Sequence, residues 1–220
     1  MIYLTALVGF LLAQTAEAVV GSSEGSVCNE TPQCLLFNTV CKSQNFEIRH
    51  YDPVKWVCTS FSAPTWMLGV GPAFWRMKNY LDDNQISMSA APVFIDMPAD
   101  DPPQKESSQS SWLDKLKNLS KLFPKMHEYT ICFLLPMENQ SNPPQPTNPK
   151  VKIVETGDRY MYVRPYNDWV KGDAAQAQVL FNSINITSYE KNHYAVGYNS
   201  PMNPNPYSEV WVLVDGEPRC

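Results

Sequence analysis

Two stretches separated by about half the chain repeat the same order of residue types. Ile48-Arg49-His50-Tyr51 and Val163-Arg164-Pro165-Tyr166 each run from a β-branched residue through arginine to tyrosine, and a tryptophan follows each. A second pair of motifs, Ala91-Pro92-Val93 and Ser200-Pro201-Met202, has nearly the same spacing. Near-constant spacing of unlike motifs indicates an internal duplication. We therefore expect two similar halves that share one core.

The residues around the first motif alternate with a period of two, which is typical of a strand. This pattern places Phe46, Ile48 and His50 on one face, with Arg49 on the other. Asp52-Pro53 interrupts the run, and β-favouring residues resume after it, so the sequence predicts a hairpin. A second hairpin is predicted between residues 151–154 and 160–163, with Thr156-Gly157-Asp158 as its turn.

Each half also contains one segment with the period of a helix. In residues 66–84 the apolar residues recur at i, i+4, i+7 and i+11, and Gly71-Pro72 predicts where the regular helix begins. Asp173 is a candidate N-cap for a second helix whose apolar face is Ala177, Leu180, Phe181 and Ile184. Each half thus consists of two strands, a helix and two more strands, which predicts an α+β fold with eight strands and two helices.

The start of the chain predicts a domain division. Residues 1–18 form an apolar leader that ends in Ala16-Glu17-Ala18, a small-residue pattern typical of a signal peptide cleavage site, and the leader is too short to span a bilayer. We assign 19–45 to a cysteine-rich N-terminal arm and 46–220 to one domain with an insertion at 100–125. Because no later stretch reaches about 20 consecutive apolar residues, we expect a soluble mature product.

The cysteines and sequons indicate an oxidising compartment. An even number of cysteines, all after the leader, predicts disulfide bonds, although the sequence leaves their pairing open. We expect Cys220 to pair with the N-terminal segment and Cys58 with Cys132. A metal site is not indicated, because there is no C-x-x-C motif and the histidines are scattered. We therefore expect a secreted, extracellular glycoprotein. The cysteines are Cys28, Cys34, Cys41, Cys58, Cys132 and Cys220, and the glycosylation candidates are Asn29, Asn118, Asn139 and Asn185.

Charge and motifs exclude several function classes. The chain has 17 basic and 22 acidic residues, a net charge of -5, without a basic cluster, so nucleic acid is not an expected partner. It carries no G-x-S-x-G, H-E-x-x-H, P-loop or dinucleotide fingerprint, so we expect no catalytic residues and no enzyme activity.

The insertion contains an amphipathic segment. Trp112, Leu116, Leu119 and Phe123 follow helical spacing, with lysines on the opposite side. One interpretation is a short helix that covers an exposed sheet edge. The other is a helix at 112–123 that contacts a membrane or a protein partner, with its tryptophan at the interface.

Several motifs, in order, resemble those of the SOUL haem-binding proteins over residues 46 to 213. The resemblance implies a distorted eight-stranded antiparallel β-barrel made of two halves and flanked by two long helices. It also implies non-covalent binding of haem or a related tetrapyrrole. The leader, the cysteines and the insertion depart from the intracellular members. The motifs are FEIRHYDPVKWV from Phe46, Lys78-Asn79-Tyr80-Leu81, Ala91-Pro92-Val93, Asn142-Pro143-Pro144-Gln145-Pro146, Gly197-Tyr198-Asn199-Ser200-Pro201 and Glu209-Val210-Trp211.

The same resemblance suggests a haem site. His50 occurs where some family members carry the proposed axial histidine, which makes it our candidate iron ligand; the alternative is a strand histidine bonded to a neighbouring carbonyl. Arg49 and Lys78 could pair with the propionates, or could belong to a solvated face. The apolar candidates lie on the first helix, where such stripes also serve as core. They are Met67, Val70, Phe74 and Met77.

We therefore expect a secreted haem or tetrapyrrole carrier, scavenger or sensor that is not catalytic. The alternative is an extracellular protein- or membrane-interaction module that keeps the fold without binding haem. His127 and His193 are expected to be ordinary surface residues.

Overall fold

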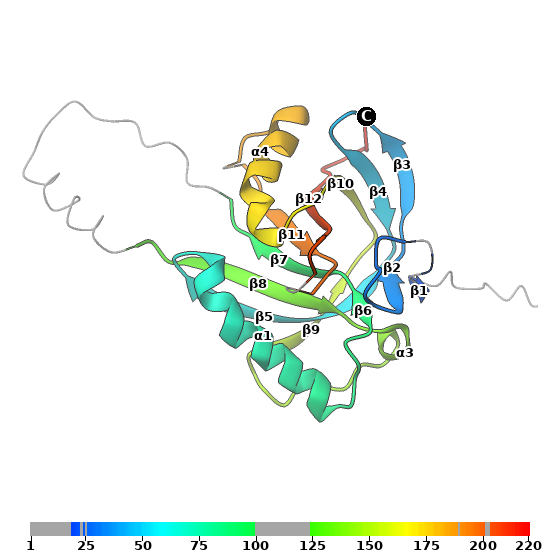
Figure 1. Cartoon of the computed structure of the whole chain (residues 1–220), viewed down its shortest axis with the longest axis vertical. Coiled ribbons are helices and arrows are strands. Elements are labelled where there is room, and N and C mark those ends of the chain that lie inside the picture. Colours follow the sequence, from blue (N-terminus) through cyan, green and yellow to red (C-terminus); the bar gives the residue numbers. More distant parts are fainter. Residues whose placement is uncertain (1–18, 23, 25, 100–123, 189, 201–202) are drawn as a thin grey trace, which may run out of the picture.

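The main element of the computed structural model is an antiparallel sheet of nine strands in the order β3-β4-β10-β12-β11-β7-β8-β5-β9 (Figure 1). The structure describes residues 19–22, 24, 26–99, 124–188, 190–200 and 203–220. The strands are β3 (Asn38–Lys42), β4 (Glu47–Tyr51), β5 (Val54–Ala63), β7 (Val93–Met97), β8 (His127–Leu134), β9 (Val151–Thr156), β10 (Arg159–Tyr166), β11 (His193–Gly197) and β12 (Ser208–Leu213).

The sheet is curled but open. Within the described residues its end strands, β3 and β9, each pair with a single neighbour, β4 and β5 respectively. The α+β class and the antiparallel sheet are therefore confirmed, whereas a closed eight-stranded barrel is not. The extra strand has a simple origin, because β3 comes from the N-terminal arm and adds to the edge that β4 would otherwise expose.

The doubled plan predicted from the sequence is present in the order of elements. The run of two strands, a helix and two strands occurs as β4-β5-α1-β7-β8 and again as β9-β10-α4-β11-β12. The eight strands from β4 to β9 also have a symmetric order in the sheet. The counterparts are β4 and β9, β5 and β10, β7 and β11, and β8 and β12, and members of each pair lie at equal distances from the two ends of this order. The motif alignment was nevertheless wrong, because Arg49 lies on β4, which corresponds to β9, whereas Arg164 lies on β10.

Both predicted hairpins are wrong. β4 pairs with β3 and β10, while β5 pairs with β8 and β9. Likewise β9 and β10 do not pair with each other, although they are adjacent in the chain. The turns at Asp52-Pro53 and Thr156-Gly157-Asp158 carry the chain from one half of the sheet to the other. A turn signal in the sequence marks a break between strands but does not select the strand that each will pair with.

Helices α1 (Trp66–Asp83) and α4 (Asp173–Ser183) pack on the two halves of the sheet, α1 against β5 and β8, and α4 against β10 and β12 (Figure 1). α1 begins at Trp66 and contains Pro72, so Gly71-Pro72 does not mark its start as expected. Asp173 is the first residue of α4, and the N-cap is Gly172. Because α4 has 11 residues, the expectation of two long helices is not confirmed. The described residues also contain two short helices, α3 (Met137–Gln140) and η1 (Val170–Gly172).

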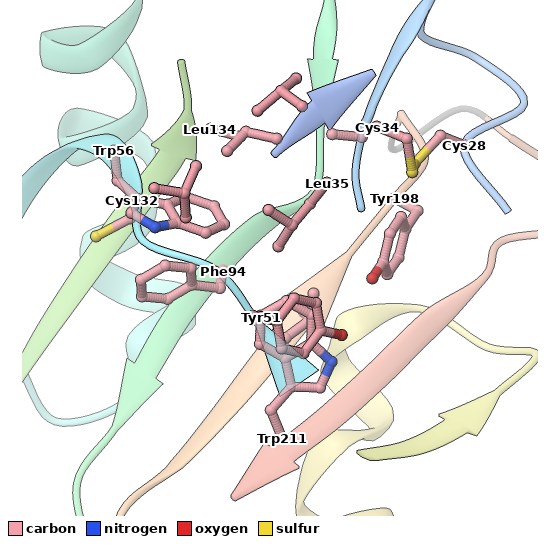
Figure 2. Packing of buried hydrophobic residues seen from close by; sticks show 14 of the residues in the cluster. Cys28, Cys34, Leu35, Tyr51, Trp56, Phe94, Cys132, Leu134, Tyr198 and Trp211 are labelled. Atoms are coloured by element: carbon pink, nitrogen blue, oxygen red, sulfur yellow. A yellow bond between two sulfur atoms is a disulfide. The ribbon is translucent and has the colours of Figure 1, made fainter. Parts of the chain in front are cut away.

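Side-chain alternation divides the core between the two faces of the sheet. The outer face carries α1 and α4 and their apolar clusters. The concave face holds a third cluster built around Trp56, Phe94 and Trp211 (Figure 2). The N-terminal arm covers this concave face, since Val20 and Leu35 are buried in the same cluster. The arm forms a small sheet in which β2 pairs antiparallel with β1 and parallel with β6. Its strands are β1 (Val20–Ser22), β2 (Gln33–Leu35) and β6 (Ala90–Ala91).

Three disulfide bonds join all six cysteines. Cys58 and Cys132 are direct cross-strand partners on β5 and β8, and their predicted bond is confirmed. Cys220 pairs with Cys41, which confirms its expected link to the N-terminal segment. The third bond joins Cys28 to Cys34 within the arm. Disulfides of this kind are characteristic of an oxidising compartment.

No helix among the described residues is both long and apolar enough to cross a bilayer.

Candidate functional site

Strand β4 sends the two predicted site residues Arg49 and His50 to opposite faces of the sheet. Ile48, two residues before His50, is buried in the cluster beneath α4. Tyr51, two residues after Arg49, is buried in the concave cluster with Trp211. This is the alternation predicted from the sequence. The two side chains therefore do not face a common pocket.

Arg49 is the centre of a buried polar network. Its guanidinium is 4% exposed and makes 2.9 Å ion pairs with Glu47 and with the fully buried Glu209. The guanidinium carbon also lies 4.0 Å from the centre of the Phe37 ring. Although burial opposes the charge, the adjacent Glu209 carboxylate raises the pKa of Arg49 above its ordinary value. Arg49 therefore stays charged and fully engaged within the protein.

His50 lies near the rim of the outer face. Its Nε2 is 2.9 Å from Oδ1 of Asp158, and its ring centroid is 4.9 Å from that of Tyr160. Asp52 completes a group of three donors whose ligating atoms all lie within 4.8 Å of one another. One imidazole and two carboxylates could hold a divalent cation. Because Nε2 is paired with a carboxylate, Nδ1 is the imidazole nitrogen that could take an iron without breaking that pair.

The predicted α1 residues differ in burial. Met77 is fully buried, and Val70 and Phe74 pack against the same cluster, so these three form the core contact of the helix. Met67 and Lys78 lie at the edge of this buried stripe, where their side chains are more exposed. Lys78 donates from Nζ to Oδ2 of Asp82 at 2.6 Å in an exposed pair one turn apart.

The side of α1 that carries Met67 and Lys78 also carries apolar residues that the sequence analysis missed. Among the large hydrophobic side chains of the described residues, the three most exposed are Leu68 (71%), Trp75 (60%) and Met67 (59%). Apart from its two chain neighbours and the adjacent helix backbone, a Cβ atom at Gly71, between Leu68 and Trp75, would meet no atom within 4 Å. At about 100° per residue these positions share one helix face, which we call the α1 outer face and define as Met67, Leu68, Gly71, Trp75 and Lys78.

A separate cavity of about 190 Å³ opens on the concave face of the sheet. Five aromatic residues contribute to its lining (Figure 2 shows several of them), and two charged residues, Asp96 and Arg159, also line it. We call this space the concave cavity. None of the residues predicted as haem ligands or contacts lines it. The aromatic residues are Tyr51, Trp56, Phe94, Tyr194 and Trp211.

The sequence indicates which face of each strand these side chains take, but it does not show that they surround one cavity. The large aromatic lining residues occupy strand positions that alternate toward the concave face, as Trp56 does on β5, Phe94 on β7 and Trp211 on β12. These side chains come together because of the order of the strands in the sheet. Both predicted hairpins gave the wrong strand pairs, so the cavity could not be predicted.

The remaining site predictions concern the surface. Asn29 and Asn185 are exposed, and Asn139 is half-buried on α3. Asn118 and the amphipathic segment 112–123 lie outside the described residues. His193 is half-buried, with Nε2 3.0 Å from Oδ2 of Asp173, so it is not the ordinary surface residue that we expected.

Comparison with curated proteins supplies close relatives. The chain is 28% identical to Heme-binding protein 2 of Homo sapiens over 185 residues, which is 79% of this chain and 80% of the relative. The Mus musculus Heme-binding protein 2 matches with the same identity and coverage. Heme-binding protein 1 of Bos taurus is 30% identical over 92 residues, covering 40% of this chain and 48% of the relative.

A family model extends the match to most of the sheet. The model described as SOUL heme-binding protein matches residues 30–213. This range begins in the arm and runs to the last residue of β12, so it includes α1, α4 and all the strands that line the concave cavity. The chain therefore belongs to the SOUL heme-binding protein family.

Proposed function

We propose that the protein binds haem or a related tetrapyrrole non-covalently, at the α1 outer face, as an extracellular carrier, scavenger or sensor without catalysis. The observation that carries this proposal is the concentration of the most exposed large apolar side chains on one helix face of a family member. Exposed apolar surface of this kind marks binding sites, because leaving it in water is unfavourable.

The residues of this face fit a planar, apolar ligand with acidic edges. Gly71 leaves open space between the Leu68 side chain and the Trp75 indole, so a flat ring can approach the helix backbone there. Haem supplies an iron that takes axial nitrogen or sulfur ligands, and Met67 offers an exposed thioether. Lys78 can pair with a propionate, since its exposed pair with Asp82 contributes about 1 kcal/mol or less.

The concave cavity is a poor alternative for this ligand. Its 190 Å³ lies below the roughly 300 Å³ at which pockets begin to accept drug-sized molecules. Arg49 is also an unsuitable propionate partner, because releasing it would leave the Glu209 carboxylate buried and unpaired. His50 as iron ligand remains a prediction, in which either Nδ1 binds the iron or Nε2 leaves Asp158 to do so.

Haemin titration of the purified mature chain tests the proposal. We expect a saturable shift of the Soret band with one haem per chain. Trp75→Ala should weaken binding about tenfold or more, since it removes a large stacking surface that can contribute more than 1.4 kcal/mol. Met67→Leu keeps the volume but removes the sulfur, so we expect it to alter the spectrum of the bound iron.

Two further variants locate the site. Val179→Ala, at an exposed apolar position of α4, serves as the matched control and should leave binding unchanged. If His50→Ala abolishes binding while Trp75→Ala has no effect, the haem site lies at β4 and the α1 proposal is wrong. Uptake that never saturates would contradict haem binding itself.

Secretion is part of the same proposal. The three disulfide bonds and the two exposed sequon residues Asn29 and Asn185 support it. Expression in secretory cells should release into the culture medium a protein that begins at residue 19 and has no free thiol. Removal of N-glycans should increase its electrophoretic mobility. Retention in the cell with the leader intact would contradict secretion.

A second candidate function uses the same surface. Exposed tryptophan, leucine and methionine on one helix face also suit insertion into a membrane interface or contact with a protein. Liposome flotation with Trp75→Ala, and with a chain that lacks residues 100–125, would reveal a membrane-binding module. Flotation that disappears in either variant, combined with no saturable haem binding, would favour this candidate.

A further inference from the structure

The concave cavity has the features of a second ligand site, on the opposite side of the sheet from the α1 outer face. We infer that it binds a small aromatic carboxylate, with the ring held among the aromatic walls and the carboxylate paired with Arg159. This inference goes beyond haem binding and does not depend on it. It rests on the volume of the cavity, its lining, and the position of one cation.

The volume selects the size of the ligand. A dry, apolar protein cavity of about 150 Å³ accepts benzene, and the concave cavity is slightly larger, at about 190 Å³. It therefore has room for one benzene ring and a short substituent.

The walls select the shape and character of the ligand. Phe94 lies edge-on to both Trp56 and Tyr194, with ring centroids 4.7 Å and 5.4 Å apart. On another side, the Tyr51 and Trp211 rings are 5.0 Å apart. The polar atoms of Tyr51, Trp56 and Trp211 form hydrogen bonds with other side chains of the protein. These residues therefore present mainly ring carbon atoms to the cavity. Such walls favour a flat aromatic group.

Arg159 supplies the charge. It is the first residue of β10 and lies opposite Tyr51 in the ladder with β4, on the same side as Met161, so its half-buried side chain belongs to the concave face. Its chain neighbour Asp158 is directed to the other face, where it pairs with His50. Among the described residues Arg159 forms no ion pair. A guanidinium that no carboxylate holds is suited to bidentate pairing with a ligand carboxylate.

The carboxylate in the lining, Asp96, does not change this assignment. Oδ1 of Asp96 accepts a hydrogen bond from Asn192 Nδ2 at 3.3 Å, so Asp96 already has a partner within the protein. Burial also raises its pKa, with a partial offset from Asn192 and from the nearby His193. A charge on Asp96 is therefore less favourable than on a free aspartate, and the hydrogen bond from Asn192 holds its carboxylate within the protein.

Calorimetric titration with three ligands of matched size tests the charge. Phenylacetate should bind saturably. Phenylacetamide is the same size without the charge, and 2-phenylethylamine reverses the charge; both should bind at least about tenfold more weakly, since neither can form the charged hydrogen bonds with Arg159. If either binds as tightly as phenylacetate, or if phenylacetate shows no saturable binding, the inference is overturned.

Variants and spectra test the location. Arg159→Gln should weaken phenylacetate about tenfold, Arg159→Lys should restore part of the affinity, and Arg219→Gln, at an exposed arginine near the C-terminus, should have no effect. In a ¹H–¹⁵N spectrum, the indole signals of Trp56 and Trp211 should shift on binding, while that of Trp75 on α1 should not. Unfolding curves show whether each variant folds. A wild-type affinity in folded Arg159→Gln, or a shift confined to Trp75, would contradict the site.

Discussion

At the scale of single residues, the concave face contains a buried network of hydrogen bonds centred on Glu209. The Glu209 side chain is fully buried and accepts hydrogen bonds from Arg49, Tyr198, Tyr207 and Trp211. Burial, together with the Glu209 charge, raises the pKa of Tyr198, so this phenol remains a donor. One carboxylate therefore ties together β4, β11 and β12, the strands that carry or flank these donors.

We predict that Glu209→Gln lowers the free energy of unfolding by about 3 kcal/mol or more, because it leaves Arg49 buried without its main countercharge. Urea unfolding followed by fluorescence measures the change. Lys42→Gln is the control. It removes the exposed pair between Lys42 and Glu47 and should cost about 1 kcal/mol or less. Equal effects of the two substitutions would show that the Glu209 network is not a major source of stability.

A second residue-scale prediction concerns pH. Burial raises the pKa of Asp96 above its ordinary 3.8, against smaller opposing effects of Asn192 and His193. The folded state therefore binds the proton more tightly than the unfolded state, and the stability gained at low pH is lost as the pH rises through the raised pKa. Asp96→Asn cannot ionise, so we expect it to be more stable than the wild type at about pH 7 and similar to it at about pH 3.

Urea unfolding at several pH values checks this behaviour. The difference in unfolding free energy between Asp96→Asn and the wild type should grow as pH rises from the ordinary pKa of an aspartate. A difference that grows in the opposite direction would mean that the charged form of Asp96 is the better-stabilised one.

At the scale of elements, α1 contains two glycines in contrasting surroundings. A Cβ atom at Gly69 would lie 2.2 Å from Cδ2 of Phe61 and 3.2 Å from the Cβ of Ala63, so this glycine lets the helix lie close to β5. At Gly71 the same atom would meet nothing within 4 Å beyond its chain neighbours and the adjacent helix backbone. The two positions therefore compare a glycine that the sheet crowds with one that it does not.

We predict that Gly69→Ala destabilises the fold by about 1–3 kcal/mol, because it overpacks the contact between α1 and β5. Gly71→Ala should change stability by about 0.5 kcal/mol or less, because the gain in helix propensity is opposed by crowding of the new methyl group against the Pro72 ring that follows. Thermal unfolding of the two variants beside the wild type provides the comparison. If Gly71→Ala destabilises the fold as much as Gly69→Ala, the contact with β5 is not what distinguishes the two positions, whereas a neutral Gly69→Ala would mean that α1 can move away from β5.

At the scale of the whole molecule, the N-terminal arm is part of the domain rather than an appendage. Leu35 on β2 is 3% exposed and lines the concave cavity, whereas its neighbour Leu36 is 39% exposed. The disulfide between Cys41 and Cys220 joins β3 of the arm to the last residue of the described chain. The walls of the concave cavity therefore come from both the sheet and the arm.

We predict that Leu35→Ala lowers the unfolding free energy by about 2–5 kcal/mol, since it removes buried apolar contact and enlarges the cavity. Leu36→Ala is the adjacent control and should change stability by about 0.5 kcal/mol or less. Chemical denaturation measures both variants. If they behave alike, the arm does not contribute its buried contacts to the stability of the domain.

Much of this architecture follows from local patterns. Alternation around Ile48 identified a strand and the opposite directions of Arg49 and His50, and the apolar spacing of Val70, Phe74 and Met77 identified the buried side of α1. The ordered motifs indicated the family, which the match over residues 30–213 confirms. These features depend on residues close together in the chain, where the backbone period fixes side-chain direction.

The sequence by itself therefore determined the main strands and helices of the two halves, their doubled order and the face that alternating residues take, while it left the cysteine pairing open. Only the tertiary structure decided that the sheet stays open, that β4 pairs with β10 rather than β5, and that Trp56, Phe94 and Trp211 surround one cavity. The physical reason is that strand pairing and cavity formation depend on contacts between distant segments. An alternating pattern shows which face a side chain takes, but it does not identify the strand that will lie beside it.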